Sequence, residues 1–101
     1  MRLIAIEHEM PGVRAADFQP HLKAEARRAW DLYCAGNIRE MYFTRDDHRA
    51  VLMLECNGEE EAEELLASLP LVQNGLIRFE LLPLRPYDGF SRLFAKLSQE
   101  G

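Results

Sequence analysis

The stretch that decides the fold is IREMYFTRDDHRAVLMLEC, residues 38–56. It contains two runs of β-favouring residues, 38–45 and 50–56, separated by the polar residues 46–49. Two such runs joined by about four polar residues predict a β-hairpin. The hairpin divides the chain into an N-terminal and a C-terminal part, and each part contains one further strand pattern and one helix pattern.

The N-terminal part begins with a short apolar run at residues 2–8, which predicts a strand. A helix is expected to start after Asp17 or Pro20 and to end at Cys34 or Ala35, with Gly36 at its C-cap. The C-terminal part predicts a helix over residues 59–69 and a strand over 76–84. Pro83 near the end of that strand favours an edge position or a strand terminus.

The predicted order is therefore β-α-β-β-α-β, an α+β arrangement in which two right-handed crossovers produce a four-stranded antiparallel sheet with both helices on one face. This is the ferredoxin-like fold. We expect one domain over residues 1–101, with a core at 2–86 and a tail at 87–101. The tail has apolar residues at helical spacing, namely Phe90, Leu93, Phe94 and Leu97.

Alternation along the strands sorts their residues into two faces. We expect an apolar set under the helices: Ile4, Ile6, Met41, Phe43, Leu52, Leu54, Ile77, Phe79 and Leu81. The other face is expected to hold a mixed set: Leu3, Ala5, Glu7, Ile38, Glu40, Tyr42, Val51, Met53, Glu55, Arg78, Glu80 and Leu82. The second set is too apolar to face water alone, so we expect a second copy of the chain to cover it, giving a homodimer or a larger homo-oligomer.

Composition excludes several classes of protein. The net charge is −5 and there is no basic stripe, which disfavours binding to nucleic acid or to anionic membranes. The apolar run at the N-terminus is too short for a signal peptide or a membrane span, so we expect a soluble, cytoplasmic protein with reduced Cys34 and Cys56. No His-x-x-x-His or Cys-x-x-Cys spacing indicates a metal site, and no phosphate or dinucleotide motif is present.

The fold topology suggests where a site would lie. The end of the first strand, the start of the first helix and the hairpin turn share one rim of such a sheet, which brings together all three histidines, His8, His21 and His48. His21 and Glu25 are four residues apart, so they lie on one side of the first helix. Arg45 ends the second strand at the same rim.

Several short motifs resemble the muconolactone isomerase family over roughly residues 2–86. They are LKAE at 22–25, Gly36-x-x-Arg39, LASLPL at 66–71 and the pattern FE-x-x-PL at 79–84. The resemblance implies a ferredoxin-like subunit that pairs through its sheets into a dimeric α+β barrel, in some members a decamer. It also implies isomerisation of an unsaturated lactone by proton transfer, without metal or cofactor. Of the family's polar positions, Glu25 and Arg39 carry over.

Two departures concern the substrate pocket. The family has a tryptophan-rich second strand where this chain has IREMY at 38–42, and a Phe-Pro-Tyr sequence where this chain has VQNG at 72–75. The aromatic walls of a lactone pocket are therefore absent or moved. The fold transfers from the resemblance, whereas the substrate does not.

The hypothesis for the site gives each polar residue a role. A carboxylate at the edge of an apolar pocket has a raised pKa, so Glu25 is the candidate base. His21 or Tyr42 would donate to the enolate oxygen, and Arg39 or Arg45 would hold a substrate carboxylate, with His8 at the same rim. The ligand is expected to be a small organic acid or lactone, with no cofactor.

Other interpretations stay open. The chain is alternatively a non-catalytic ligand-binding or assembly protein on the same scaffold, or a relative of the hydrolase-like or monooxygenase-like dimeric α+β barrels. His21 and Glu25 also fit an ordinary exposed i,i+4 pair. Trp30 is interpreted as a packing anchor rather than as part of a binding surface.

Overall fold

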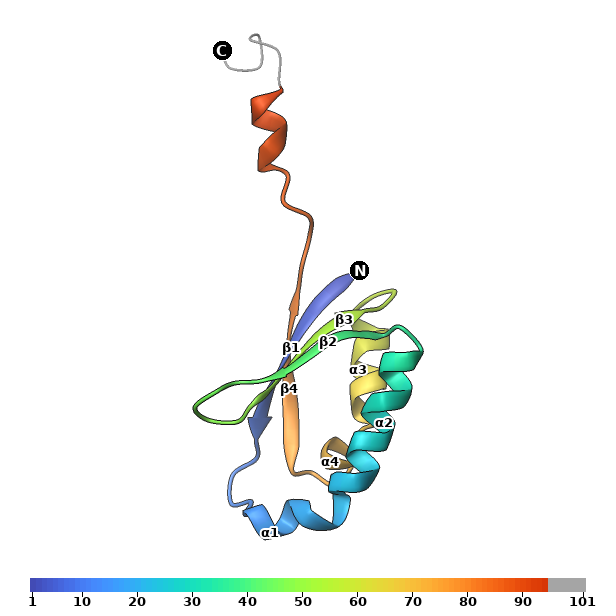
Figure 1. The fold of residues 1–101 in the computed structure, drawn as a ribbon, viewed down its shortest axis with the longest axis vertical. Helices are drawn as coiled ribbons and strands as arrows, with labels where there is room; N and C mark the ends of the chain where they lie inside the picture. Colours follow the sequence, from blue (N-terminus) through green and yellow to red (C-terminus); the bar gives the residue numbers. More distant parts are fainter. Residues whose placement is uncertain (95–101) are drawn as a thin grey trace.

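A computed structural model describes residues 1–94 of the chain, and its centre is a four-stranded sheet (Figure 1). The strands are β1 (Arg2–Glu9), β2 (Ile38–Phe43), β3 (Ala50–Glu55) and β4 (Ile77–Pro83). Their order in the sheet is β2-β3-β1-β4, and all three neighbouring pairs are antiparallel. The predicted ferredoxin-like α+β fold is therefore confirmed, with β2 and β4 as the edge strands.

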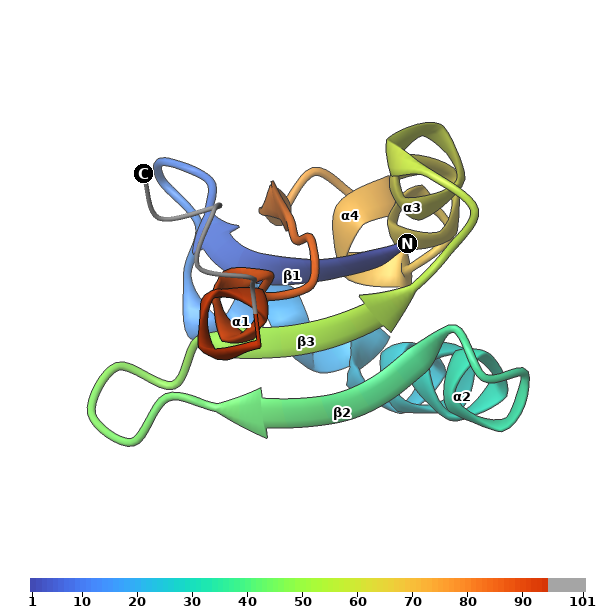
Figure 2. The ribbon, with the colours of Figure 1, turned by 90° about the horizontal axis from the view of Figure 1, so that it is seen from above.

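The helices lie on one side of the sheet (Figure 1). They are α1 (Ala15–Phe18), the 3-10 turn η1 (Gln19–His21), α2 (Leu22–Cys34), α3 (Glu59–Ala67) and α4 (Pro70–Gln73). Figure 2 shows α3 and α4 at the β1 side of the sheet and α2 beside β2. Of the two predicted starts of the first helix, after Asp17 and after Pro20, the second agrees with α2, because Pro20 lies in the 3-10 turn before it. The predicted connection after residue 69 contains the short helix α4.

Gly36 ends α2 in the way the sequence predicts. Its φ is +86°, a left-handed conformation that residues with a Cβ rarely adopt. This conformation turns the chain so that the Gly36 N–H donates to Tyr33 O and the Asn37 N–H donates to Leu32 O, each at 3.0 Å. Two carbonyls of the last turn are thereby satisfied, and the chain enters β2 at a defined angle.

The core lies between the sheet and the helices, and it corrects the predicted faces of β1. Leu3 and Ala5 have no exposed surface, and Glu7 is also buried on this side, whereas Ile4 and Ile6 lie on the opposite face. The prediction is wrong here because residues 3–6 are apolar at every position, so the pattern does not distinguish the two faces. The register pairs Ala5 with Leu52, which fixes the observed arrangement.

Ile38 also lies on the helix side, contrary to the prediction, with 1% of its surface exposed. The register of β2 against β3 shifts between Ile38 and Glu40, which is a β-bulge. A bulge inserts one residue and reverses the alternation beyond it. Residues after the bulge keep their predicted faces, so Met41 pairs with Leu52 on the helix side.

The far face of the sheet, opposite the helices, is mixed as predicted once β1 is reassigned. Its apolar members Ile4, Ile6, Val51 and Met53 are half-buried in the single chain. Its charged members pair with one another: Arg2 Nε lies 3.2 Å from Glu55 Oε1, and His8 Nε2 lies 2.9 Å from Glu80 Oε1. Within residues 1–94, no helix covers this face (Figure 1).

After β4 the chain leaves the body of the molecule as an extended segment and ends in the 3-10 helix η2 (Gly89–Leu93) (Figure 1). Tyr87 packs edge-on against Phe90, with ring centroids 4.9 Å apart. The Tyr87 ring lies where a Cβ on Gly89 would be, so this contact requires glycine. The helix predicted from the spacing of Phe90, Leu93 and Phe94 is thus present as the short 3-10 helix η2. Leu97, the fourth residue of that pattern, lies outside the described residues.

Candidate functional site

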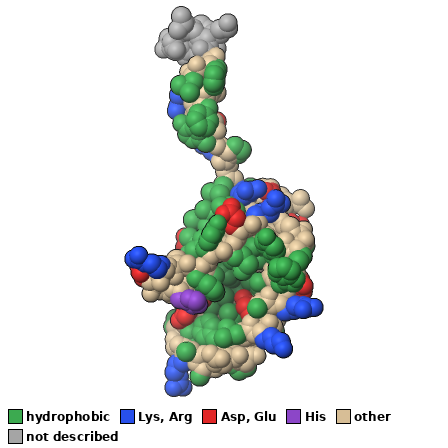
Figure 3. Space-filling view, viewed as in Figure 1, with side chains coloured by type: hydrophobic (Ala, Val, Ile, Leu, Met, Phe, Trp, Pro, Cys, Tyr) green, Lys and Arg blue, Asp and Glu red, His purple; other side chains and the backbone are tan. Residues whose placement is uncertain are grey.

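A cavity of about 1150 Å³ opens between the helix side of the sheet and the α1–α2 segment. All four strands contribute to one wall, residues from Ala15 to Tyr33 form the other, and Leu69 and Leu71 at the start of α4 complete the lining. Figure 3 shows this region as a hollow lined mainly by hydrophobic side chains. The aromatic lining residues are Phe18, Trp30, Tyr33, Tyr42, Phe43 and Phe79. The cavity is therefore large enough, and apolar enough, for a small cyclic molecule.

Glu25 lines the cavity from the first turn of α2. Its Oε1 accepts a hydrogen bond of 2.9 Å from the backbone N–H of Leu71, in α4. Burial raises the pKa of Glu25, the charge of Glu7 raises it further, and the Leu71 N–H and the charge of His21 lower it in part. The balance is an upward shift, so Glu25 binds a proton more readily than an ordinary glutamate. This is the behaviour expected of a proton-transferring carboxylate.

Glu7 is a second carboxylate in the same cavity, and the sequence interpretation missed it by assigning it to the far face. Only 7% of Glu7 is exposed. Its Oε1 accepts a hydrogen bond of 2.7 Å from the backbone N–H of Ala50, and its carbonyl oxygen accepts one of 3.1 Å from Arg49 Nε. The strand alternation carried no signal that Glu7 faces inward, because the apolar residues before it occupy both faces of β1.

The structure brings only some of the predicted site residues into the cavity. Glu25, Arg39 and Tyr42 line it. His21 is half-buried and acts on Glu25 through its charge, although it is not part of the lining. His48, grouped with the rim histidines in the sequence, does line the cavity.

His8 and Arg45 lie away from the cavity. His8 lies on the far face, hydrogen-bonded to Glu80 at 2.9 Å, because the alternation of β1 is the reverse of the predicted one. Arg45 is in the hairpin turn, where 91% of its side chain is exposed and its Nε lies 2.9 Å from Asp46 Oδ1. These placements correct the expectation that both residues contribute to substrate binding.

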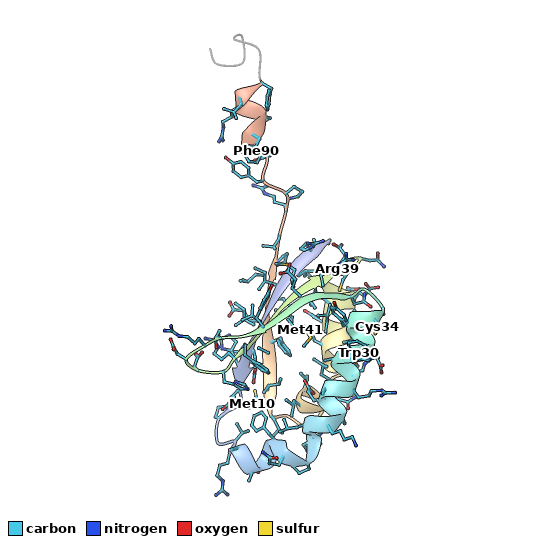
Figure 4. The ribbon with its side chains drawn as sticks, viewed as in Figure 1. Met10, Trp30, Cys34, Arg39, Met41 and Phe90 are labelled. Atoms are coloured by element: carbon cyan, nitrogen blue, oxygen red, sulfur yellow. The ribbon has the colours of Figure 1, made fainter. Side chains whose placement is uncertain are left out.

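Arg39 is at the opposite end of the cavity from Glu25. Figure 4 places it at the start of β2, beside the end of α2 that contains Cys34. Glu25 is in the first turn of that helix, nine residues earlier, which corresponds to roughly 13 Å along the helix axis. Glu25 and Arg39 therefore line the cavity at different levels along α2.

Tyr42 is already engaged. Its hydroxyl donates to Glu40 Oε1 at 2.5 Å, and this bond, followed by the charge of Glu40, raises the pKa of Tyr42. The tyrosine hydroxyl must exchange this acceptor for the ligand before it can serve as the donor proposed from the sequence. Both residues are on the edge strand β2, on the same face as Met53 and Val51, with which they pair, so they border the cavity from the far-face side of its mouth.

The aromatic wall is also a feature that the sequence interpretation missed. Trp30 is 58% exposed and stacks on Tyr33, with ring centroids 5.7 Å apart and an interplanar angle of 28°. The interpretation of Trp30 as a packing anchor is therefore wrong. Phe43 stacks on His48 at 3.9 Å on the opposite wall. The spacing i,i+3 of Trp30 and Tyr33 was the available signal, since it places both rings on one side of a helix.

Two features, a metal site and a membrane-spanning helix, are not found in the part of the chain that the structure describes. Residues 1–94 contain no group of three or more His, Cys, Asp or Glu side chains positioned to hold a metal ion. They also contain no helix with the length and apolar character needed to cross a membrane.

Comparison with known proteins defines the fold and leaves the family open. No family model matches the chain, and no similar curated protein is found. Among solved structures, 5-chloro-2-hydroxyhydroquinone dehydrochlorinase from Burkholderia phenoliruptrix, in complex with 2,5-dihydroxybenzoquinone, superposes with a TM-score of 0.70. The two proteins are 15% identical, and the match covers 88% of this chain and 98% of that one. The similarity extends over nearly the whole sheet-and-helix unit, and it supports the ferredoxin-like fold.

Proposed function

We propose that the chain is a cofactor-free enzyme of isomerase type, which moves a proton within a small lactone or organic acid bound between the sheet and α2. The observation that carries this proposal is Glu25, a carboxyl with a raised pKa in the wall of a large apolar cavity. The motifs that resemble the muconolactone isomerase family agree with this assignment. The two reduced cysteines, Cys34 and Cys56, fit a cytoplasmic protein.

In the proposed step, ionised Glu25 removes a proton from a carbon next to the carbonyl group of the substrate. The C–H bond breaks, an O–H bond forms on Glu25, and the electron pair moves onto the carbonyl oxygen to give an enolate. The enolate then collapses, and Glu25 returns the proton to a different carbon of the conjugated system. The raised pKa of Glu25 suits both halves, because a carboxylate that binds a proton more readily is a stronger base in the first half and still releases the proton in the second.

The Leu71 N–H orients the base. It holds Glu25 Oε1, while no hydrogen bond to Oε2 is present among the described residues. A carboxylate fixed through one oxygen presents the other in a constant direction, which reduces the entropy cost of reaching the reactive geometry. His21 is the candidate donor to the enolate oxygen, since it is close enough for its charge to act on Glu25.

The dehydrochlorinase of Burkholderia phenoliruptrix supports the use of this scaffold for small rings. It is an enzyme of similar fold, and its structure contains 2,5-dihydroxybenzoquinone. For this chain, the ring-binding role rests on the cavity and on its aromatic walls.

Proton exchange with solvent tests the proposal whichever product the reaction forms. The protein is incubated in D2O with a panel of unsaturated five-membered lactones, and loss of the exchangeable C–H signals is followed by NMR. We expect exchange with at least one lactone, and a decrease of about 100-fold or more in Glu25→Gln, which keeps the shape and the acceptor for Leu71 but removes the base. Glu64→Gln, at an exposed position on α3, is the matched control. Equal exchange rates in Glu25→Gln and the wild type would exclude Glu25 as the base.

One observation favours the alternative of a non-catalytic binding protein. Arg39 lies far from Glu25, and the Tyr42 hydroxyl is already bound to Glu40, so two of the polar groups expected to assist catalysis are not assembled around the base. A binding protein would bind the same rings and catalyse no exchange with any of them. Calorimetry on the lactone panel, combined with the NMR experiment, separates the two functions.

We also propose that two copies of the chain pair through the far face of the sheet. Four apolar side chains there, Ile4, Ile6, Val51 and Met53, have no helix over them within residues 1–94. The face also has both signs of charge, with Arg78 and Glu80 on β4, so that a rotated copy can place opposite charges against each other.

A further inference from the structure

The charges in the cavity are arranged unequally, and this bears on which rings it accepts. Four lining residues are glutamates: Glu7, Glu9 and Glu25, together with Glu40 at the far-face edge of β2. The single arginine of the lining, Arg39, is at the end of α2 remote from Glu25. A ligand seated against Glu25 therefore meets the carboxylates of Glu7 and Glu25 with no lining arginine beside them, although Arg49 donates to the backbone oxygen of Glu7 from outside the lining. This excess of negative charge in the lining disfavours a second anion there.

Glu7 and Glu25 form a matched pair of acceptors. Each has one oxygen held by a backbone N–H, from Ala50 at 2.7 Å and from Leu71 at 2.9 Å. The second oxygen of each has no hydrogen-bond partner among the described residues. Every fully buried side-chain oxygen in residues 1–94 does have a partner, so these two oxygens must be accessible to solvent. Glu7 is more than nine-tenths buried and still lines the cavity, so the exposed surface of its carboxylate is available to a ligand there.

The carboxylates of Glu7 and Glu25 lie near each other in the cavity lining. The charge of Glu7 is close enough to influence the protonation of Glu25. Around them the walls are aromatic, with Phe18 near the start of α2 and Phe79 from β4. Such walls suit the faces of a flat ring, while the acceptor oxygens suit hydroxyl groups at its edge.

We infer that the cavity takes a small uncharged ring with two hydroxyl groups, which donate to Glu7 and Glu25, and that it rejects the same ring when it bears a carboxylate. This deepens the proposed function and rests on it for the identity of the cavity. Of the two proposed ligand classes, small lactones and organic acids, it selects uncharged rings in their hydroxylated or enolic form.

Three small ligands separate the contributions of hydroxyl groups and charge: catechol, 1,2-dimethoxybenzene and 3,4-dihydroxybenzoate. Binding is measured at pH 7 by calorimetry and by the fluorescence of Trp30, the chain's single tryptophan, which lines the cavity. We expect catechol to bind, and we expect the affinity for each of the other two ligands to be lower by about tenfold or more. One lacks the donors, and the other adds a negative charge beside Glu25.

The variants Glu7→Gln and Glu25→Gln test whether these two residues produce the selection. Each keeps the acceptor for its backbone N–H and removes one negative charge. We expect each to narrow the ratio of catechol to 3,4-dihydroxybenzoate affinity by about fivefold or more, while Glu64→Gln leaves the ratio unchanged. If Glu7→Gln does not fold, Glu25→Gln alone provides the test, because Glu25 is only half-buried.

Equal or tighter binding of the carboxylate by the wild type would overturn the inference, as would a ratio that neither variant changes. These outcomes are distinct from failure of the proposed function. Selective binding of catechol together with no deuterium exchange in any lactone would refute proton transfer and leave the ligand selection standing. Deuterium exchange that depends on Glu25, together with preferred binding of 3,4-dihydroxybenzoate, would support proton transfer and refute the ligand selection.

Discussion

At the scale of single residues, the site depends on how two glutamates are held. A carboxylate removed from water is stabilised only where hydrogen bonds or opposite charges replace the lost hydration. Glu25 obtains one backbone N–H and the partial influence of His21, which is not enough to offset its burial and the charge of Glu7. Its pKa is therefore raised. The burial that makes Glu25 a better base also makes its ionised form unfavourable for folding.

Substitution of Glu25 should show this cost in a pH-dependent way. Because its pKa is higher in the folded than in the unfolded state, the protonated form favours folding, and that contribution is lost as the pH rises through the folded-state value. At pH 7, Glu25→Gln should therefore unfold at a higher temperature than the wild type. The difference should shrink toward pH 4, where both states of the wild type bind the proton.

Calorimetric melting of both proteins at pH 4 and pH 7 measures this difference directly. Glu64→Gln should change the melting temperature little at either pH, because residue 64 is exposed. A variant that is less stable than the wild type at pH 7 would mean that the Leu71 hydrogen bond to a charged acceptor outweighs the effect of burial.

At the scale of elements, the cavity is formed by the way α1 and α2 are joined to the sheet. Helix α2 contributes Glu25 near its start and Trp30 and Tyr33 near its end, while the bulge in β2 turns Ile38 inward and brings Met41 and Phe43 to the facing wall. The left-handed Gly36 joins these two walls. The direction of the chain at this residue therefore sets the separation of α2 and β2.

Gly36→Ala should destabilise the protein by about 1–2 kcal/mol, which is the cost of placing a Cβ in a left-handed conformation. No atom is closer than 4.0 Å to the position of the new Cβ, so the cost is conformational rather than steric. Urea unfolding with equal slopes for both proteins measures it. Gly58→Ala is a matched control, because the φ of Gly58 is 178° and its surroundings are open.

At the scale of the whole molecule, the two faces of the sheet have different surroundings. The helix side contains the core and the cavity, while the far side shows half-buried apolar residues among charged pairs. An antiparallel sheet can leave one face to water if that face is polar. The apolar residues of this face are the reason to expect a second copy against it.

Val51→Lys should convert the proposed pair into single chains, because Val51 lies on β3 within the far face and an ammonium group there would be desolvated at an interface. Light scattering coupled to size-exclusion chromatography should give the mass of two chains for the wild type and of one for the variant. Gln73→Lys adds the same charge at an exposed position of α4 and should leave the mass unchanged. A wild type that is a single chain at micromolar concentration would contradict the pairing.

The order of the strands and helices, the antiparallel sheet and the left-handed Gly36 follow from local pattern, because periodicity and turn residues act over a few positions. The inward face of β1, the bulge at Ile38 and the placement of His8 and Arg45 depend on pairing between distant strands. Glu7 belongs with them, since only the register of β1 against its neighbours shows which side it faces. The sequence alone thus determined the ferredoxin-like fold and pointed to Glu25. The tertiary structure decided which residues surround Glu25, because a cavity is made of side chains that are far apart along the chain and meet only when the sheet and helices pack.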